Sequence, residues 1–168
     1  MECGKDVHQP SNSLKREGSP LNIEAEVWED GACKRGHEID EFVNKHSTGE
    51  GLGKNFPVVD RLMRKERILV STKSLDITTR GYQKTKKLKK TLERYADALK
   101  NIEKKYFNSS GVLKWGNTAP LSVNDYDKKV LEIVLPDVII TEDASKVLND
   151  FQKTMGNSGF EVWYRVTK

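Results

Sequence analysis

The sequence has few cysteines, no long apolar run and little net charge, and each of these absences excludes a class of protein. Its two cysteines, Cys3 and Cys33, precede the first strongly periodic segment, so a disulfide framework is not expected. Residues 1–21 lack the apolar core of a secretory signal, and the longest apolar stretch, residues 130–140, contains two acids and a proline. We therefore expect neither a membrane span nor an export signal in this sequence.

What remains is the composition of a folded domain with a well-solvated surface. Hydrophobic residues make up 36% of the 168 residues and charged residues 32%, which suits one compact core. Residues 1–30 are polar and rich in Ser, Pro, Gly and charge, so we expect a lead-in or linker there. A single domain is then predicted over residues 31–168.

The positive charge is concentrated in one segment. The chain as a whole carries only +4, but residues 80–105 hold ten Lys or Arg against three acids, a local charge of +7. Such a segment is either the solvated face of an amphipathic helix or, in addition, a surface that attracts polyanions. The lysines predicted to hold nucleic-acid phosphates without reading bases are Lys84, Lys86, Lys87, Lys89 and Lys90.

Hydrophobic periodicity predicts alternating helices and strands. Apolar residues spaced by three and four predict helices over residues 36–46, 82–106 and 142–155. Short β-branched or apolar runs predict strands over residues 56–60, 68–72, 112–115, 130–135 and 160–166. A charged turn at residues 61–66 is expected to join the first two strands into a hairpin. This order predicts a sheet flanked by helices.

Three side chains of that hairpin are candidates for chemistry. Asp60 ends the first predicted strand, and Ser71 and Lys73 project to the same side of the second, because side chains alternate along a strand. Phosphodiester hydrolysis needs acidic oxygens that bind a metal and a cation that offsets the developing charge. The alternative is structural: an Asp that forms a turn and a Lys that protects a sheet edge.

A second acid is expected from the helix at residues 36–46. Glu38 and Asp40 flank its apolar stripe on either side, whereas Glu41 points away from it. Either Glu38 or Asp40 can therefore face the sheet and complete the group. The sequence leaves the choice between them open.

Several short segments resemble a known family. They are RGHEID at residues 35–40, NFPVVD at 55–60, VSTKSLD at 70–76 and YQ at 82–83. The chain from about residue 35 to its last strand resembles the C-terminal nuclease toxins of bacterial contact-dependent growth-inhibition proteins. The resemblance implies an α/β PD-(D/E)XK restriction-endonuclease-like fold with a mixed central sheet. It makes Asp60 a metal ligand, puts Ser71 where the wider superfamily has an acid, and makes Lys73 the motif lysine.

The resemblance also implies an activity and its cofactor. It predicts a metal-dependent endonuclease that cuts DNA, with a tRNA-cleaving enzyme on the same fold as the alternative. The metal ligands it suggests are Asp60, Glu38 and Ser71, with Asp40 as the other helical acid. Zinc is favoured over magnesium by the resemblance, although an oxygen-rich site alone would favour magnesium. A non-catalytic basic binding module is the alternative from another class.

Partners and location follow from the same resemblance. Such a toxin is delivered from the surface of the producing cell into the cytoplasm of a target bacterium. In the producing cell it is bound by a cognate immunity protein in the cytoplasm. A hairpin within residues 112–129 is the surface we expect to meet that partner, because an exposed strand edge can extend a partner's sheet.

Overall fold

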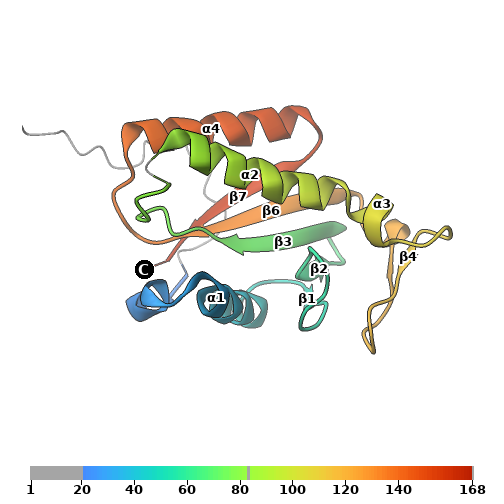
Figure 1. The fold of residues 1–168 in the computed structure, drawn as a ribbon. Coiled ribbons are helices and arrows are strands. Elements are labelled where there is room, and N and C mark those ends of the chain that lie inside the picture. Colours follow the sequence, from blue (N-terminus) through green and yellow to red (C-terminus); the bar gives the residue numbers. More distant parts are fainter. Residues whose placement is uncertain (1–20, 83, 168) are drawn as a thin grey trace, which may run out of the picture.

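A five-stranded mixed sheet organises the chain in a computed structural model that describes residues 21–82 and 84–167 (Figure 1). The sheet strands are β1 (Glu50–Gly51), β2 (Arg61–Met63), β3 (Ile68–Ser74), β6 (Lys128–Leu135) and β7 (Glu161–Val166). A separate two-stranded sheet contains β4 (Val112–Leu113) and β5 (Leu121–Ser122). The helices are η1 (Ala25–Glu29), α1 (Ala32–His46), α2 (Thr85–Lys100), α3 (Ile102–Tyr106), η2 (Val123–Asp125) and α4 (Glu142–Asn157).

The strand order in the sheet is β1-β2-β3-β6-β7. β2 runs antiparallel to both β1 and β3, whereas β3, β6 and β7 are mutually parallel. Parallel neighbours require crossover connections, and α2 and α4 lie in the two segments that provide them. The predicted α/β fold, with a mixed sheet flanked by helices, is confirmed.

The two faces of the sheet bury separate cores. The larger core lies under α2 and α4 and includes Leu88, Leu148 and Ile133, while the smaller one lies under α1 and includes Ile39 and Val134. Leu21 and Ile23, the buried residues of the described part of the predicted lead-in, belong to the smaller core. Within the described residues, no helix is both long and apolar enough to cross a bilayer.

The hairpin is present, but its first strand is displaced from the prediction. Residues 56–60 are not a strand, and the three residues after Asp60, which we predicted as a turn, form β2. The apolar run still enters the core, since Phe56 and Val59 are buried. Its backbone turns instead of extending, because Pro57 lacks a donor and Val58 adopts a positive φ of 68°. The turn of the hairpin lies at residues 64–67.

Other boundaries also differ from the prediction. α1 begins at Ala32, earlier than predicted, and the short strand β1 lies where no strand was predicted. The predicted long helix is divided at Asn101, whose side-chain amide donates to the Asp97 carbonyl at the end of α2. β4 ends at Leu113, before the predicted end of its strand.

A buried ion pair fixes β2 and β6 on either side of β3. Arg61 donates to both carboxylate oxygens of Glu132, at 2.9 and 3.0 Å, and Glu132 has no exposed surface. The Thr72 hydroxyl donates to the same carboxylate at 3.0 Å, and Arg165 on β7 approaches it at 3.4 Å. Burial opposes ionisation, but these partners lower the pKa of Glu132. A buried charge of this kind is tolerated only when it is fully paired, so the network fixes the register of four strands.

Candidate active site

The Asp60 carboxylate lies against the free edge of β3. β2 pairs with β3 only from Ile68 to Val70, so the remaining residues of β3 have no strand on that side. The Asp60 N–H donates to the Val70 carbonyl at 2.9 Å, and the next β3 donor, the Thr72 N–H, bonds to Asp60 Oδ2 at 2.6 Å. The carboxylate thus replaces the backbone carbonyl that a longer β2 would have supplied, and its position is set by the sheet.

Of the two helical acids, the structure brings Asp40 to this edge. Asp40 interacts electrostatically with Asp60 and Lys73, and its Oδ1 is buried without a hydrogen-bond partner. Glu38 lies on the solvent side of α1, with 39% of its side chain exposed, and approaches Lys34 at 3.6 Å. Glu41 is exposed, as predicted. The predicted stripe allowed either acid to face the sheet. In the structure α1 packs through the buried residues Arg35, Ile39 and Val43, and Asp40 rather than Glu38 lines the cleft.

The two carboxylates at the edge resist ionisation. Burial and the nearby charge of Asp60 raise the pKa of Asp40 to about 7, against the opposing charge of Lys73. Burial also raises the pKa of Asp60, while Lys73 and the Thr72 hydrogen bond act in the other direction. One lysine therefore does not fully compensate two half-buried acids. Groups whose ionisation is disfavoured in this way are typical of sites that bind a cation or transfer protons.

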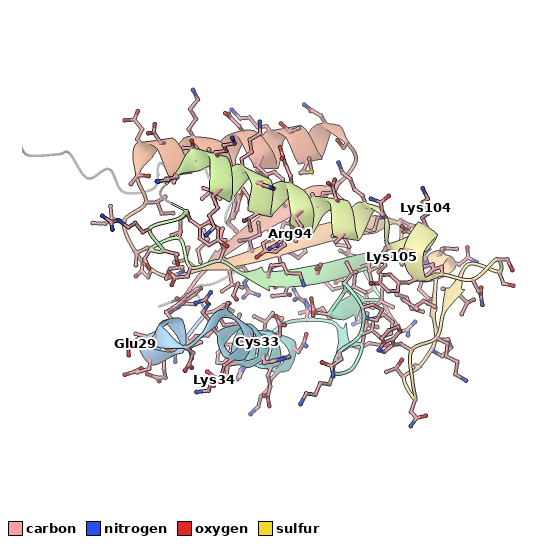
Figure 2. All side chains as sticks on the ribbon, in the orientation of Figure 1. Glu29, Cys33, Lys34, Arg94, Lys104 and Lys105 are labelled. Carbon is pink, nitrogen blue, oxygen red and sulfur yellow. The ribbon has the colours of Figure 1, made fainter. Side chains whose placement is uncertain are left out.

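Asp40 and Lys73 border a cleft of about 350 Å³, whose lining residues come mainly from α1, β3 and α2. β3 contributes Thr72, Lys73 and Ser74 to its wall, and α1 contributes Asp40. The α2 side is formed by Arg94 and Tyr95, with Tyr82 from the preceding loop, and Arg94 extends toward β3 (Figure 2). Cationic, acidic and aromatic groups therefore meet in one depression.

Ser71, which precedes the cleft residue Thr72 on β3, hydrogen-bonds to backbone. Ser71 and Lys73 share a face of β3, as strand alternation requires. The Ser71 hydroxyl is buried and donates to the Val58 carbonyl at 2.5 Å. Its proton is thus directed to the loop that precedes Asp60.

The residues present suit a divalent cation bound by oxygen. Asp40 and Asp60 provide two carboxylates, and the unpartnered Asp40 Oδ1 is a buried acceptor that a cation would satisfy. No group of three or more His, Cys, Asp or Glu side chains in the described part of the chain could hold a metal. Backbone carbonyls, water and substrate phosphate would complete the coordination, as is common for hard cations.

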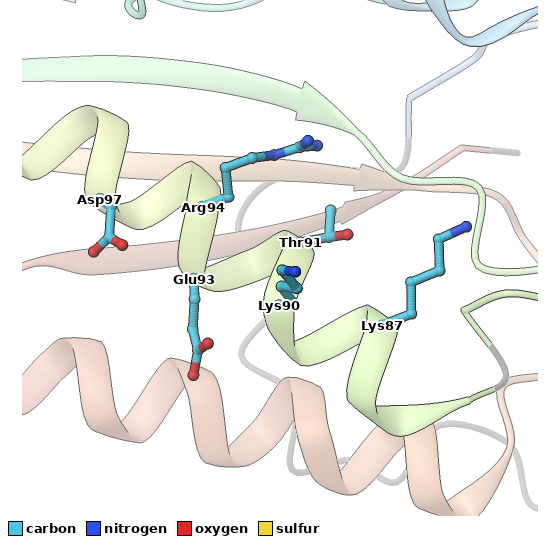
Figure 3. Close-up of a pocket in the computed structure, with 6 residues that line it drawn as sticks. All are labelled: Lys87, Lys90, Thr91, Glu93, Arg94 and Asp97. Atoms are coloured by element: carbon cyan, nitrogen blue, oxygen red, sulfur yellow. The ribbon is translucent and has the colours of Figure 1, made fainter.

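The five predicted phosphate-binding lysines lie at the start of α2 but do not share one direction. Lys87 and Lys90 line a hollow of about 580 Å³ on α2, with Arg94 and the acids Glu93 and Asp97 (Figure 3). Arg94 lines both the hollow and the cleft. The other three of these five lysines, Lys84, Lys86 and Lys89, are exposed and do not line the hollow.

Sequence reasoning missed the groups that depend on distant parts of the chain. Arg61 was assigned to a turn, and Glu132 is one acid in an apolar run, a pattern that reveals no partner. Arg94 and Tyr95 belong to a helix whose stripe was correctly predicted, but the cleft they line exists only after α1 and α2 pack beside β3. A polar residue in a buried strand was the one available signal for Glu132.

A mixed sheet with helices on both faces is the architecture expected of a restriction-endonuclease-like domain. The chain belongs to the family described as the CDI toxin restriction endonuclease-like domain, whose model matches residues 35–162. It is therefore a toxin domain of contact-dependent growth inhibition with an endonuclease-like fold, and this membership implies delivery into target cells. The resemblance seen in the sequence is confirmed.

A solved structure has the same fold. One chain of the CdiA-CT/CdiI toxin and immunity complex from Yersinia pseudotuberculosis matches with a TM-score of 0.58 and 18% sequence identity. The match covers 77% of this chain and 98% of that chain. At this identity the likeness shows the fold alone. No curated protein sequence matches the chain.

The raised pKa of Asp40 predicts a pH-dependent cost to the metal-free fold. Its pKa is about 7 in the folded protein, against an ordinary value of 3.8. Ionisation therefore penalises the folded state, and stability falls as the pH rises from about 4 to 7. Asp40→Asn should raise the unfolding free energy at pH 8 by on the order of 2 kcal/mol, allowing for partial solvent access, and change it little at pH 4.

Urea denaturation in the presence of a chelator measures this difference. Glu41→Gln is the matched control, since it removes an exposed acid from the same helix. Equal effects of Asp40→Asn at both pH values would show that Asp40 titrates normally.

Proposed function

We propose that this domain is a metal-dependent endonuclease that hydrolyses phosphodiester bonds of DNA in the cytoplasm of the target bacterium. The observation that carries the proposal is the convergence of Asp40, Asp60 and Lys73 at the free edge of β3, with two disfavoured carboxylate charges and one unpartnered carboxylate oxygen. Such a group is costly for folding, which favours a catalytic role over a structural one.

Each side chain has a role in this proposal. Asp40 and Asp60 hold the divalent metal, which when bound polarises the phosphate and lowers the pKa of a water molecule. The Thr72 N–H fixes the orientation of the Asp60 carboxylate. Lys73 offers a positive charge to the oxygens on which negative charge develops. Arg94, across the cleft, is suited to bind a flanking phosphate.

The proposal also concerns which metal and which nucleic acid the domain uses. Family resemblance favours zinc, whereas the carboxylate ligands favour magnesium. DNA is preferred to tRNA as the substrate by the same resemblance. Incubating the purified protein with plasmid and with total tRNA, with Zn²⁺, with Mg²⁺ and with chelator, tests both assignments. Cleavage of tRNA with intact plasmid would replace the DNA assignment by the tRNA one.

Single variants separate the two helical acids. Asp60→Asn, Lys73→Ala and Asp40→Asn should each lower the cleavage rate by at least about 100-fold, because each removes a metal ligand or the charge that stabilises the transition state. Glu38→Gln, on the same helix, should stay within a few-fold of the unchanged protein. A large loss in Glu38→Gln with activity retained in Asp40→Asn would reverse the assignment.

The same variants address the non-catalytic alternative. A basic binding module would keep its toxicity after Asp60→Asn or Lys73→Ala and would lose it when the α2 lysines are neutralised. Loss of toxicity in a folded Asp60→Asn protein excludes that module.

We also propose that nucleic acid lies along the cleft side of α2. Lys87, Lys90 and Arg94 are three, four and seven residues apart and border one hollow, and Arg94 also lines the cleft. Lys87 also lies 5.3 Å above the ring of Tyr82, which lines the cleft. Lys89, by contrast, does not line the hollow, and its ammonium group approaches Glu93 at 3.9 Å.

Two double variants that each remove two positive charges from α2 test whether nucleic acid lies on this side of the helix. Lys87→Ala with Lys90→Ala should weaken DNA binding about tenfold at 0.1 M salt and reduce the slope of log K against log salt by up to about 2. Lys86→Ala with Lys89→Ala should leave the slope nearly unchanged. Equal losses in the two pairs would mean that only the net charge of the helix matters.

A cognate immunity protein is the proposed protein partner, as in the Yersinia complex. The β4–β5 hairpin projects beyond the main sheet and is suited to this contact (Figure 1). Trp115 follows β4 with 42% of its surface exposed, and its ring meets that of Tyr106 edge-on at 6.3 Å. Exposed aromatic residues of this kind often dominate the energy of an interface.

Trp115→Ala should weaken immunity binding by at least about tenfold and leave DNA cleavage unchanged. Ile139→Ala is the control, because Ile139 is another exposed apolar residue and lies in the loop after β6. Calorimetric titration with the immunity protein gives both affinities. An unchanged affinity in the Trp115 variant would remove the hairpin from the interface.

A further inference from the structure

The loop before Asp60 contains a strained turn. Val58 has φ of 68°, a left-handed conformation that β-branched residues rarely adopt. The Val59 N–H donates to the Pro57 carbonyl at 2.8 Å, so the three residues form a γ-turn with positive φ at its centre. This form of the γ-turn is rare and strained. Such a conformation persists only when the surrounding structure enforces it.

Ser71 supplies the contact that opposes the strain. Its hydroxyl donates to the Val58 carbonyl at 2.5 Å, and the residue is only 1% exposed. Water therefore cannot readily replace this hydrogen bond. Val59, with no exposed surface, holds the other side of the turn in the core. The bond joins the centre of the turn to β3, the strand whose edge carries the Asp60 carboxylate.

The position of Asp60 depends on this turn. Asp60 follows Val58 by two residues, and its carbonyl accepts from the Leu52 N–H at 2.9 Å while its own N–H bonds to Val70. An extended backbone at Val58 would continue the chain along another path. The Asp60 carboxylate would then lose its alignment with the Thr72 N–H.

We propose that Ser71 is a positioning residue: its hydroxyl holds the strained Val58 turn that delivers the Asp60 carboxylate to the edge of β3. This role differs from the direct metal contact that the family resemblance implies for Ser71. It rests on the proposed function of Asp60 only for its effect on cleavage. The alignment of Asp60 itself can be measured without metal or substrate.

The test uses Ser71→Ala, Val58→Gly and the double variant. Glycine adopts positive φ without strain, so the backbone of the Val58→Gly variant needs no Ser71 bond to keep its turn. We expect Ser71→Ala to lower metal affinity and cleavage by about tenfold, the scale of one lost hydrogen bond. Val58→Gly should stay near the unchanged protein, and the double variant should recover most of the loss. Val162→Ala, a buried residue of β7, controls for general loss of stability.

Amide hydrogen exchange of Thr72 in the metal-free protein is the independent readout. Exchange should speed up in Ser71→Ala and slow again in the double variant. Full protection in Ser71→Ala, or failure of Val58→Gly to restore protection and metal affinity, would overturn the proposal. If Asp60→Asn cleaves normally while Thr72 exchange follows this pattern, the proposed nuclease function fails and the positioning role stands.

Discussion

The candidate site depends on one hydrogen bond, between the Thr72 N–H and the Asp60 carboxylate. It forms next to the first residue of β2, where β3 extends beyond its pairing with β2. The Asp60 side chain therefore accepts a backbone hydrogen bond of β3 that no strand residue accepts. Behind it, the same residue Thr72 donates its hydroxyl to the buried Glu132–Arg61 pair. One residue thus joins the edge that bears the site to the ion pair that fixes the strands. A shift of register by one residue would break both contacts, since it would reverse the faces of β3.

The acidic residues around Thr72 differ in how well they are paired with cations, and this difference suggests different roles for them. Glu132 is paired with two arginines, and its pKa is lowered although it is fully buried. Asp40 and Asp60 share a lysine, and the pKa of each is raised. The paired acid therefore stabilises the sheet, while the poorly paired acids are left available for a cation. We infer that the domain keeps its poorly compensated carboxylates at the candidate site, as enzymes do at sites that bind a ligand.

The sequence predicted those features that repeat locally. The stripe of α2, the apolar run of β6 and the alternation of Ser71 and Lys73 each follow from a regular period, and all three appear in the structure. The strand predicted over residues 56–60 was wrong because an apolar run can enter a core through a turn, and propensity does not register the positive φ of Val58. The choice between Asp40 and Glu38 could not be predicted, because it depends on how α1 packs on the sheet through Arg35, Ile39 and Val43. The pairing of Arg61 with Glu132 joins residues 71 positions apart, which no local pattern encodes.

The central claim is that Asp40 and Asp60 together hold a divalent metal at the free edge of β3. The most direct measurement is anomalous diffraction from crystals of the domain grown with Mn²⁺ or Zn²⁺. The account predicts an ion between the two carboxylates, beside Lys73 and within the cleft. An ion held by Glu38, or full occupancy at another place with the Asp40–Asp60 pair left without metal, would contradict it.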